Sequence, residues 1–208
     1  MKFILGKKLE MTQLYDEQGK AYPVTLVEIG PCYVTQVKTA EKDGYAAVQI
    51  GCGQTKDKKM KRPQKGHLKA VQEKNGNIKN LKFLKEFRVE NTEFNSGDEI
   101  KADIFKEGDV VRVSGISKGK GFAGVVKRHG FGGGPKTHGQ KHSLRKPGSI
   151  GATFPERVPK GRRMAGRMGA DRVTVEGLKI VKVDAENNIL AILGAVPGPK
   201  GTLLEIKE

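Results

Sequence analysis

Short runs of alternating apolar and polar residues occupy both ends of the chain, and this period of two is typical of β-strands. Val, Ile, Leu and Thr fill these runs, and Gly, Pro, Asp and Asn separate them, as expected for strands joined by turns. The first fifty residues are therefore predicted to be β, and so is the C-terminal part. The predicted strands are residues 24–29, 32–37, 45–50, 110–116, 173–183, 189–196 and 202–206, with residues 94–105 also extended.

The stretch between residues 53 and 87 has a different pattern. Residues 68–74 and 78–87 show the apolar spacing of short helices, with a break at Asn75-Gly76-Asn77. Residues 53–66 are rich in Lys and polar side chains and also contain Gly and Pro, which predicts a loop.

Predicted strands thus lie on both sides of a glycine-rich basic segment, with little helix between them. The simplest architecture is mainly β, with one barrel assembled from distant parts of the chain. Folded double, the basic segment has about 26 residues each way, which at ~3.3 Å per residue gives a reach of up to roughly 85 Å. The expected domains are a barrel (1–55, 97–116 and 171–208), a small partly helical insertion (56–96) and a basic arm (117–170).

Charge is concentrated in residues 116–167. They contain thirteen Lys or Arg and one acid, Glu156, so they carry +12 of the formal net charge of +16. They also hold twelve of the 28 glycines and three of the four histidines. So few apolar side chains cannot offset an ordering cost of roughly 1–2 kcal/mol per residue. We therefore expect this arm to be disordered until it binds a polyanion, for which its length favours a nucleic acid over a small ligand.

Other classes of protein fit the sequence less well. No apolar run approaches the ~20 residues of a spanning helix, and the apolar stretch after Lys2 is too short for a signal peptide. A cytoplasmic protein that does not bind a membrane is therefore expected. In that compartment Cys32 and Cys52 are predicted to be buried free thiols rather than a disulfide.

Residues 119–124 match the glycine pattern GxGxxG, but a dinucleotide site needs a following helix and an acid about twenty residues on. Residues 125–130 are a poor helix opening, and no acid lies near residue 144. The Asp motifs of kinases are missing, and there is neither a nucleophile elbow nor a convincing pair of carboxylates. We expect no enzyme, no cofactor and no small-molecule substrate. The interleaved glycines instead let the backbone approach phosphates closely.

His138 and His142 form an HxxxH pattern near His129, yet no Cys or carboxylate partners accompany them, so no metal site is predicted. These histidines either contact phosphates and bases or are exposed without a role. Arg can chelate phosphate or stack on bases, which suits structured RNA. The predicted RNA-binding residues are Lys118, Lys120, Lys127, Arg128, His129, Lys136, His138, Lys141, His142, Arg145, Lys146, Arg157, Lys160, Arg162, Arg163 and Arg167. A second basic patch is either a solvated loop or a further RNA contact: Lys56, Lys58, Lys59, Lys61, Arg62 and Lys65.

The motifs of the arm closely resemble those of one family, bacterial ribosomal protein L3 of the large subunit. The resemblance runs from end to end and rests on residues 11–13, 30–32, 117–131, 133–135, 137–139, 147–151, 160–166 and 194–201. It implies a six-stranded barrel of the type shared with translation factors and a non-catalytic protein. It also implies binding to 23S ribosomal RNA early in assembly, near the 3′ end of that RNA, beside ribosomal proteins similar to L14 and L19.

The same resemblance implies that the arm tip lies close to the peptidyl transferase centre. Carried onto this chain, the tip comprises Ser149, Ile150, Gly151, Ala152, Thr153 and Phe154. The chain departs from the family pattern at three places. Glu10 replaces the usual Gly, and Phe154-Pro155-Glu156-Arg157 differs from the usual Thr-Pro-Gly-basic run. Ala152 stands where some relatives carry a methylated Gln, so that modification cannot occur here.

Two other hypotheses belong to different classes. A free-standing RNA chaperone or translation factor could also pair a barrel with a basic arm, and it should exchange on and off ribosomes, whereas a structural protein should survive a high-salt wash. A nucleotide-dependent enzyme is the more distant alternative, and it should bind labelled ATP or NAD.

Overall fold

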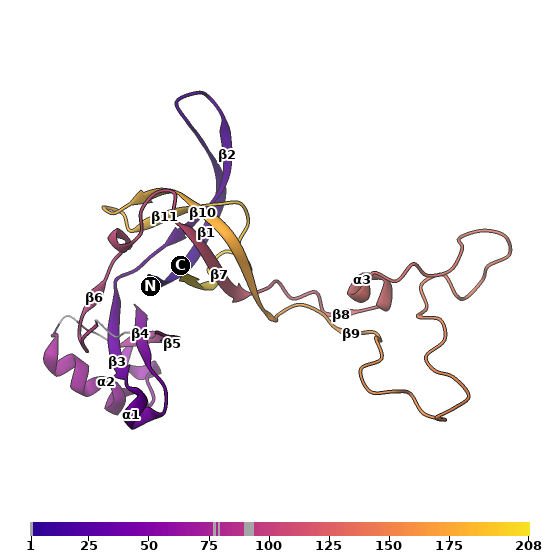
Figure 1. The fold of residues 1–208 in the computed structure, drawn as a ribbon, viewed down its shortest axis with the longest axis horizontal. Helices are drawn as coiled ribbons and strands as arrows, with labels where there is room; N and C mark the ends of the chain where they lie inside the picture. The colour runs from indigo at the N-terminus through magenta and orange to yellow at the C-terminus, as the bar shows by residue number, and fades with distance from the viewer. Residues whose placement is uncertain (1, 77, 79, 90–93) are drawn as a thin grey trace. The chain divides into compact units, whose positions relative to one another are not determined.

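The computed structural model describes residues 2–76, 78, 80–89 and 94–208 (Figure 1). The chain forms two compact units. We call residues 1–116 with 172–208 the barrel unit, and residues 117–171 the basic unit. The protein is mainly β, as the sequence pattern predicts.

A closed barrel of six antiparallel strands forms the larger part of the barrel unit, which confirms the predicted barrel. The C-terminal strand closes it by pairing with the N-terminal strand, from Phe3 opposite Lys207 to Lys7 opposite Leu203. The strands, in their order around the barrel, are β1 (Phe3–Tyr15), β12 (Leu203–Lys207), β7 (Val110–Ile116), β10 (Arg172–Asp184), β11 (Ile189–Leu193) and β2 (Ala21–Glu28).

Bulges and glycines allow these strands to bend around a small barrel. The register shifts between Lys8 and Met11 in β1 and twice along β10, and such bulges increase local bend and twist. Gly6 lies where an added Cβ would come 2.5 Å from Cγ1 of Val27, so a larger residue there would push neighbouring strands apart.

A second, four-stranded sheet completes the barrel unit, in the order β5-β4-β3-β6. The helix α2 (Arg62–Lys74) buries Leu68 and Val71 in a small cluster with Met60, Ile78 and Leu81. The strands are β3 (Cys32–Lys38), β4 (Ala47–Gln54), β5 (Leu81–Arg88) and β6 (Glu99–Ile100), and the remaining short elements are α1 (Ala40–Asp43), η1 (Asp57–Lys59) and η2 (Ala102–Ile104).

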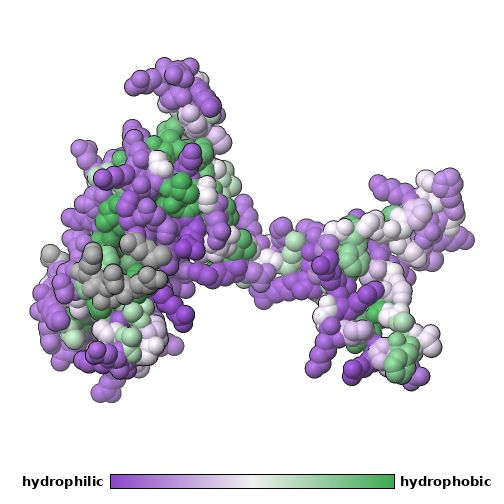
Figure 2. Space-filling view, viewed as in Figure 1, coloured by the Kyte–Doolittle hydropathy of each residue, from purple (hydrophilic) through white to green (hydrophobic). Residues whose placement is uncertain are grey.

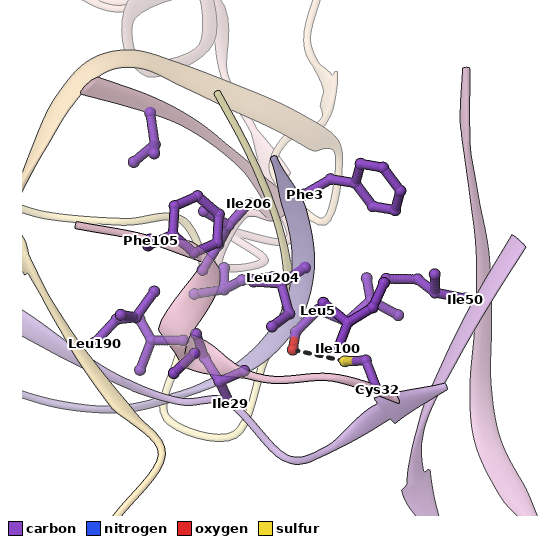
Figure 3. Close-up of a cluster of buried hydrophobic side chains, with 14 of the residues drawn as sticks. Phe3, Leu5, Ile29, Cys32, Ile50, Ile100, Phe105, Leu190, Leu204 and Ile206 are labelled. Carbon is purple, nitrogen blue, oxygen red and sulfur yellow. Dashed lines mark hydrogen bonds between the residues drawn. The ribbon is translucent and has the colours of Figure 1, made fainter. Parts of the chain in front are cut away.

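One hydrophobic core joins the barrel to this sheet. Phe3, Ile4 and Leu5 are all buried, although their side chains alternate in direction, because both faces of β1 are covered. The ring of Phe3 stacks on Phe87 of β5 with centroids 4.7 Å apart. Figure 3 shows Leu204 and Ile206 of the barrel in the same cluster as Ile50 of the sheet.

Three parts of the barrel unit differ from the sequence prediction. Residues 32–54, which the pattern assigns to the barrel, lie in the four-stranded sheet, where β4 pairs with β5 from Ala47–Arg88 to Gln54–Leu81. That pairing also makes residues 81–88 a strand, so the helix predicted over 78–87 is wrong. The apolar residues of 81–88 fit both the period of 3.6 of a helix and the period of two of a strand. Pairing with the edge of β4 stabilises the strand. Residues 57–59 and 62–66 are helical rather than a loop, and Pro63 lies in the first turn of α2.

The basic unit contains three short elements, β8 (Phe122–Ala123), α3 (Val125–His129) and β9 (Gly166–Arg167). Only Ala123 and Val125 are buried in it. Residues 125–130 have the pattern of a poor helix opening, yet one turn of helix forms there. It ends at Gly130, whose φ of 73° provides the left-handed conformation of a helix C-terminus.

Candidate nucleic-acid interface

The Lys and Arg side chains of the basic unit are all exposed. The unit carries thirteen of them, with Glu156 and Asp171 as its only acids. No ion pair within the described part of the chain involves any residue of 117–171. These cations are therefore available to an external polyanion without breaking internal pairs.

The two ends of the basic unit run together as an antiparallel ladder. The N–H of Lys120 donates to the carbonyl of Met168, and the N–H of Met168 donates to the carbonyl of Gly121, both at 2.9 Å. Gly169, at φ 75°, lies so close to this ladder that an added Cβ would be 2.2 Å from the carbonyl oxygen of Lys118. The ladder brings the predicted residues Lys118, Lys120 and Arg167 to one end of the unit.

Two predicted RNA contacts also have an internal role. Nη1 of Arg128 donates to the carbonyl oxygen of Met164 at 2.9 Å, and Nε2 of His129 lies 3.0 Å from the same oxygen. A carbonyl oxygen only accepts, so Nε2 of His129 carries a proton. At Gly166 an added Cβ would lie 2.6 Å from Nη1 of Arg128, so a larger residue there would displace the end of this side chain. Arg128 and His129 thus hold the returning strand and still present the exposed part of the guanidinium and the imidazole ring to solvent.

A glycine-rich turn brings the next part of the unit close to residues 143–148. The N–H of Gly134 donates to the carbonyl of Leu144 at 2.9 Å, and an added Cβ at Gly133 would lie 2.2 Å from that oxygen. A hollow of about 760 Å³ opens here, and the residues that line it are Gly132, Gly133, Gly134, Gly148, Phe131, Ser143, Lys146 and Pro147. The loop that the turn supports carries five of the predicted RNA-binding residues: Lys136, His138, Lys141, His142 and Arg145.

The predicted tip is a loop of exposed residues. Its first hydroxyl, Oγ of Ser149, donates to the carbonyl of Gly151 at 2.7 Å. Arg162 donates to the carbonyl of Ser149 and so links the tip to the returning half of the segment. Phe154 is 87% exposed, so its ring is free to contact a partner. The predicted cations that follow the tip, Arg157, Lys160 and Arg163, are also exposed. So is Lys127, which precedes it.

The second basic patch lies on a helix start rather than on a loop. Nζ of Lys65 pairs with the carboxylate of Asp57 at 2.6 Å, and the amide of Asn80 donates to the same group. The hydrogen bond from Lys65 holds the pKa of Asp57 below its usual range, with the bond from Asn80 adding to the effect. One cation of the patch is thus neutralised internally, while Lys58 and Lys59 stay exposed.

The barrel adds two cations that sequence reasoning misses. Arg112 of β7 and Lys207 of β12 are opposite each other in the ladder, and both line a hollow of about 290 Å³ that also contains Glu86, Glu176 and Glu205. Burial lowers the pKa of Lys207, and the charge of Arg112 lowers it further. The two residues are 95 positions apart in the sequence, so no local pattern indicates that they meet.

Figure 2 shows hydrophilic residues over most of the visible surface of both units. Among the described residues, no three His, Cys, Asp or Glu side chains gather in an arrangement that could hold a metal ion. The described helices also include none that is long and apolar enough to cross a membrane.

Comparison with known proteins identifies the relatives of this chain. The sequence model of ribosomal protein L3 matches residues 25–191. The large ribosomal subunit protein uL3 of Chloroherpeton thalassium is 57% identical, with 99% of this chain and 98% of the relative covered. The uL3 proteins of Pelotomaculum thermopropionicum and Carboxydothermus hydrogenoformans are 53% and 52% identical, cover all of this chain, and are themselves covered to 96% and 97%. The similarity therefore includes both the barrel unit and the basic unit.

Proposed function

This chain belongs to the ribosomal protein L3 family, and from that premise we propose that it is a structural constituent of the large ribosomal subunit and not an enzyme. Its relatives are named as proteins of that subunit, and the similarity to them extends over almost their whole length. As a ribosomal protein it works in the cytoplasm.

Its direct ligand is 23S ribosomal RNA, and the basic unit makes the principal contacts. The observation that carries this proposal is the set of thirteen exposed Lys and Arg with no internal ion pair among the described residues. Converging RNA helices bring phosphates together, and cations placed between them relieve the repulsion. The glycines of the unit leave room for phosphates to approach the backbone. The Arg side chains can form bidentate hydrogen bonds to a phosphate or stack on bases.

The proposed position within the subunit comes from the family resemblance. The protein binds early in assembly, near the 3′ end of the RNA, beside proteins similar to L14 and L19. The tip, residues 149–154, lies near the peptidyl transferase centre, where it supports the RNA without taking part in the reaction. The exposed ring of Phe154 supports this position, because it leaves an aromatic face at the tip on which a base can stack.

A salt titration of binding to large-subunit RNA tests this proposal. The full chain is compared with a chain in which residues 118–167 are deleted, and with the double variant Arg162→Ala, Arg163→Ala. The deletion is expected to abolish most of the salt dependence. The double variant is expected to reduce the slope of log K against log salt by about 0.9 for each phosphate that the variant no longer neutralises, on a double-helix scale.

The matched control is Lys69→Ala with Lys179→Ala, which removes two exposed cations from the barrel unit. If the control lowers the slope as much as the Arg pair does, the contacts are spread over the whole surface. A deletion that leaves both the affinity and the slope unchanged would overturn the proposal.

A further inference from the structure

The two cysteines are twenty positions apart in the sequence, but they lie on the paired strands β3 and β4. Tyr33 of β3 is opposite Gly51 of β4, and Val34 is opposite Ile50, so the same register places Cys32 directly opposite Cys52. Cβ atoms of directly opposite residues lie about 4.5–5.5 Å apart, and a disulfide needs about 3.5–4.5 Å. A small closure of the two strands would therefore join the sulfur atoms. Both thiols are free, as the sequence predicts.

The environments of the two thiols are unequal. Cys32 is fully buried, and its Sγ lies 3.5 Å from the carbonyl oxygens of Leu5 and Gly30, with the contact to Leu5 drawn in Figure 3. Cys52 is 7% exposed and lines a hollow of about 290 Å³ together with Lys7 and Lys82. Of the two thiols, Cys52 is therefore the one nearer to solvent, through the hollow that it lines.

The pKa values of the two thiols are shifted in opposite directions. The interaction with the Cys32 thiol lowers the pKa of Cys52, despite the opposing effect of burial. The same interaction and burial raise the pKa of Cys32. A thiolate is the nucleophilic form of cysteine, so the more accessible thiol is also the one that loses its proton first.

We infer that Cys52 and Cys32 form a peroxide-reactive dithiol, in which Cys52 is the attacking residue and Cys32 the resolving residue. The sulfur of Cys52 attacks one oxygen of a hydroperoxide, so that an S–O bond forms, the O–O bond breaks, and the second oxygen leaves as hydroxide or alkoxide. Cys52 becomes a sulfenic acid, and the leaving group takes up the proton that Cys52 released.

In the second step the sulfur of Cys32 loses its proton and attacks the sulfur of Cys52. The S–S bond forms, the S–O bond breaks, and hydroxide leaves and becomes water. The two thiols together lose two electrons to the peroxide, and no other oxidant is needed. The product is a disulfide across β3 and β4, inside the core that joins the sheet to the barrel. Because Cys32 is buried and keeps its proton, this step is expected to be the slower one.

The test uses the purified, reduced full-length chain and hydrogen peroxide at a dose that oxidises a free thiol such as glutathione. The wild-type chain is expected to lose both thiols and two hydrogen atoms of mass, and a digest is expected to contain a peptide with Cys32 joined to one with Cys52. In Cys32→Ser, dimedone is expected to label Cys52 in place of the disulfide. In Cys52→Ser, Cys32 is expected to stay unlabelled at the same dose.

A brief pulse of iodoacetamide on the wild-type chain gives an answer that does not depend on either variant folding. Cys52 is expected to be alkylated about tenfold faster than Cys32. Two wild-type thiols that survive the peroxide dose would overturn the inference. Alkylation of Cys32 before Cys52 would overturn it as well, because it would reverse the assigned roles.

Discussion

In the barrel unit 26 Lys and Arg accompany 21 Asp and Glu, whereas the basic unit has 13 Lys and Arg with two acids. All ion pairs of the described residues lie in the barrel unit, where Glu205, for example, pairs with both Lys85 and Arg172. The core is divided in the same way, since the basic unit buries only Ala123 and Val125. The barrel unit thus balances most of its charge internally, whereas the basic unit leaves its cations unpaired, which is why we propose an anionic partner for it.

The largest expected difference between the units is in amide hydrogen exchange of the free chain. Amides of β7, β10 and β12 are expected to be protected roughly a thousandfold or more, because they open only when the barrel unfolds. Amides of residues 120–165 are expected to exchange within about tenfold of an unstructured peptide, since few backbone groups there are paired. Adding large-subunit RNA should slow the second set. Strong protection of residues 120–165 without RNA would contradict the idea that this unit needs its partner to become ordered.

Truncating one apolar side chain in each unit sharpens the comparison. Leu204→Ala in the fully buried core of the barrel is expected to lower the free energy of unfolding by about 2–5 kcal/mol, because apolar burial is reduced and a cavity is left behind. Ile150→Ala is the matched change in the basic unit, where Ile150 is 41% exposed, and its effect should stay within about 0.5 kcal/mol. Urea unfolding followed by circular dichroism measures both. Equal losses of stability would show that the basic unit contributes to the stability of the fold.

The smallest effect concerns a single ion-pair network of the barrel unit. Burial raises the pKa of Glu205, but hydrogen bonds from Arg172 and Lys85 outweigh it and leave this pKa below its ordinary value. A carboxylate with a lowered pKa stabilises the folded state above its unfolded pKa of about 4.3, and the contribution disappears as the pH falls through the folded pKa. Glu205→Gln should therefore destabilise the chain at pH 7 by less than about 1 kcal/mol, because solvent screens the pair.

At a pH below the lowered folded pKa of Glu205 the same variant should be as stable as the wild-type chain, since Glu205 is then protonated in both folded and unfolded states. Thermal unfolding at a series of pH values provides the measurement, with the exposed turn variant Glu186→Gln as the control. A difference that persists at low pH would mean that Glu205 acts through packing rather than through its charge.

Patterns within a few residues determined much of this protein. Alternating apolar positions located β2, β7, β10, β11 and β12, and the run of basic residues without acids located the candidate interface. Burial of Cys32 and Cys52 followed from the apolar runs around them. Such features depend on the residue itself and its immediate neighbours, which is why the sequence alone indicates them.

Tertiary structure decided where each segment found its partner. Residues 81–88 are a strand because β4 offers a free edge. Residues 32–54 were predicted to belong to the barrel, but their strands β3 and β4 pair within the second sheet. In the basic unit, only the folded path brings Arg162 to the carbonyl of Ser149 and Arg128 to that of Met164. Hydrogen bonds between distant segments depend on the three-dimensional route of the whole chain, and a local pattern carries no information about that route.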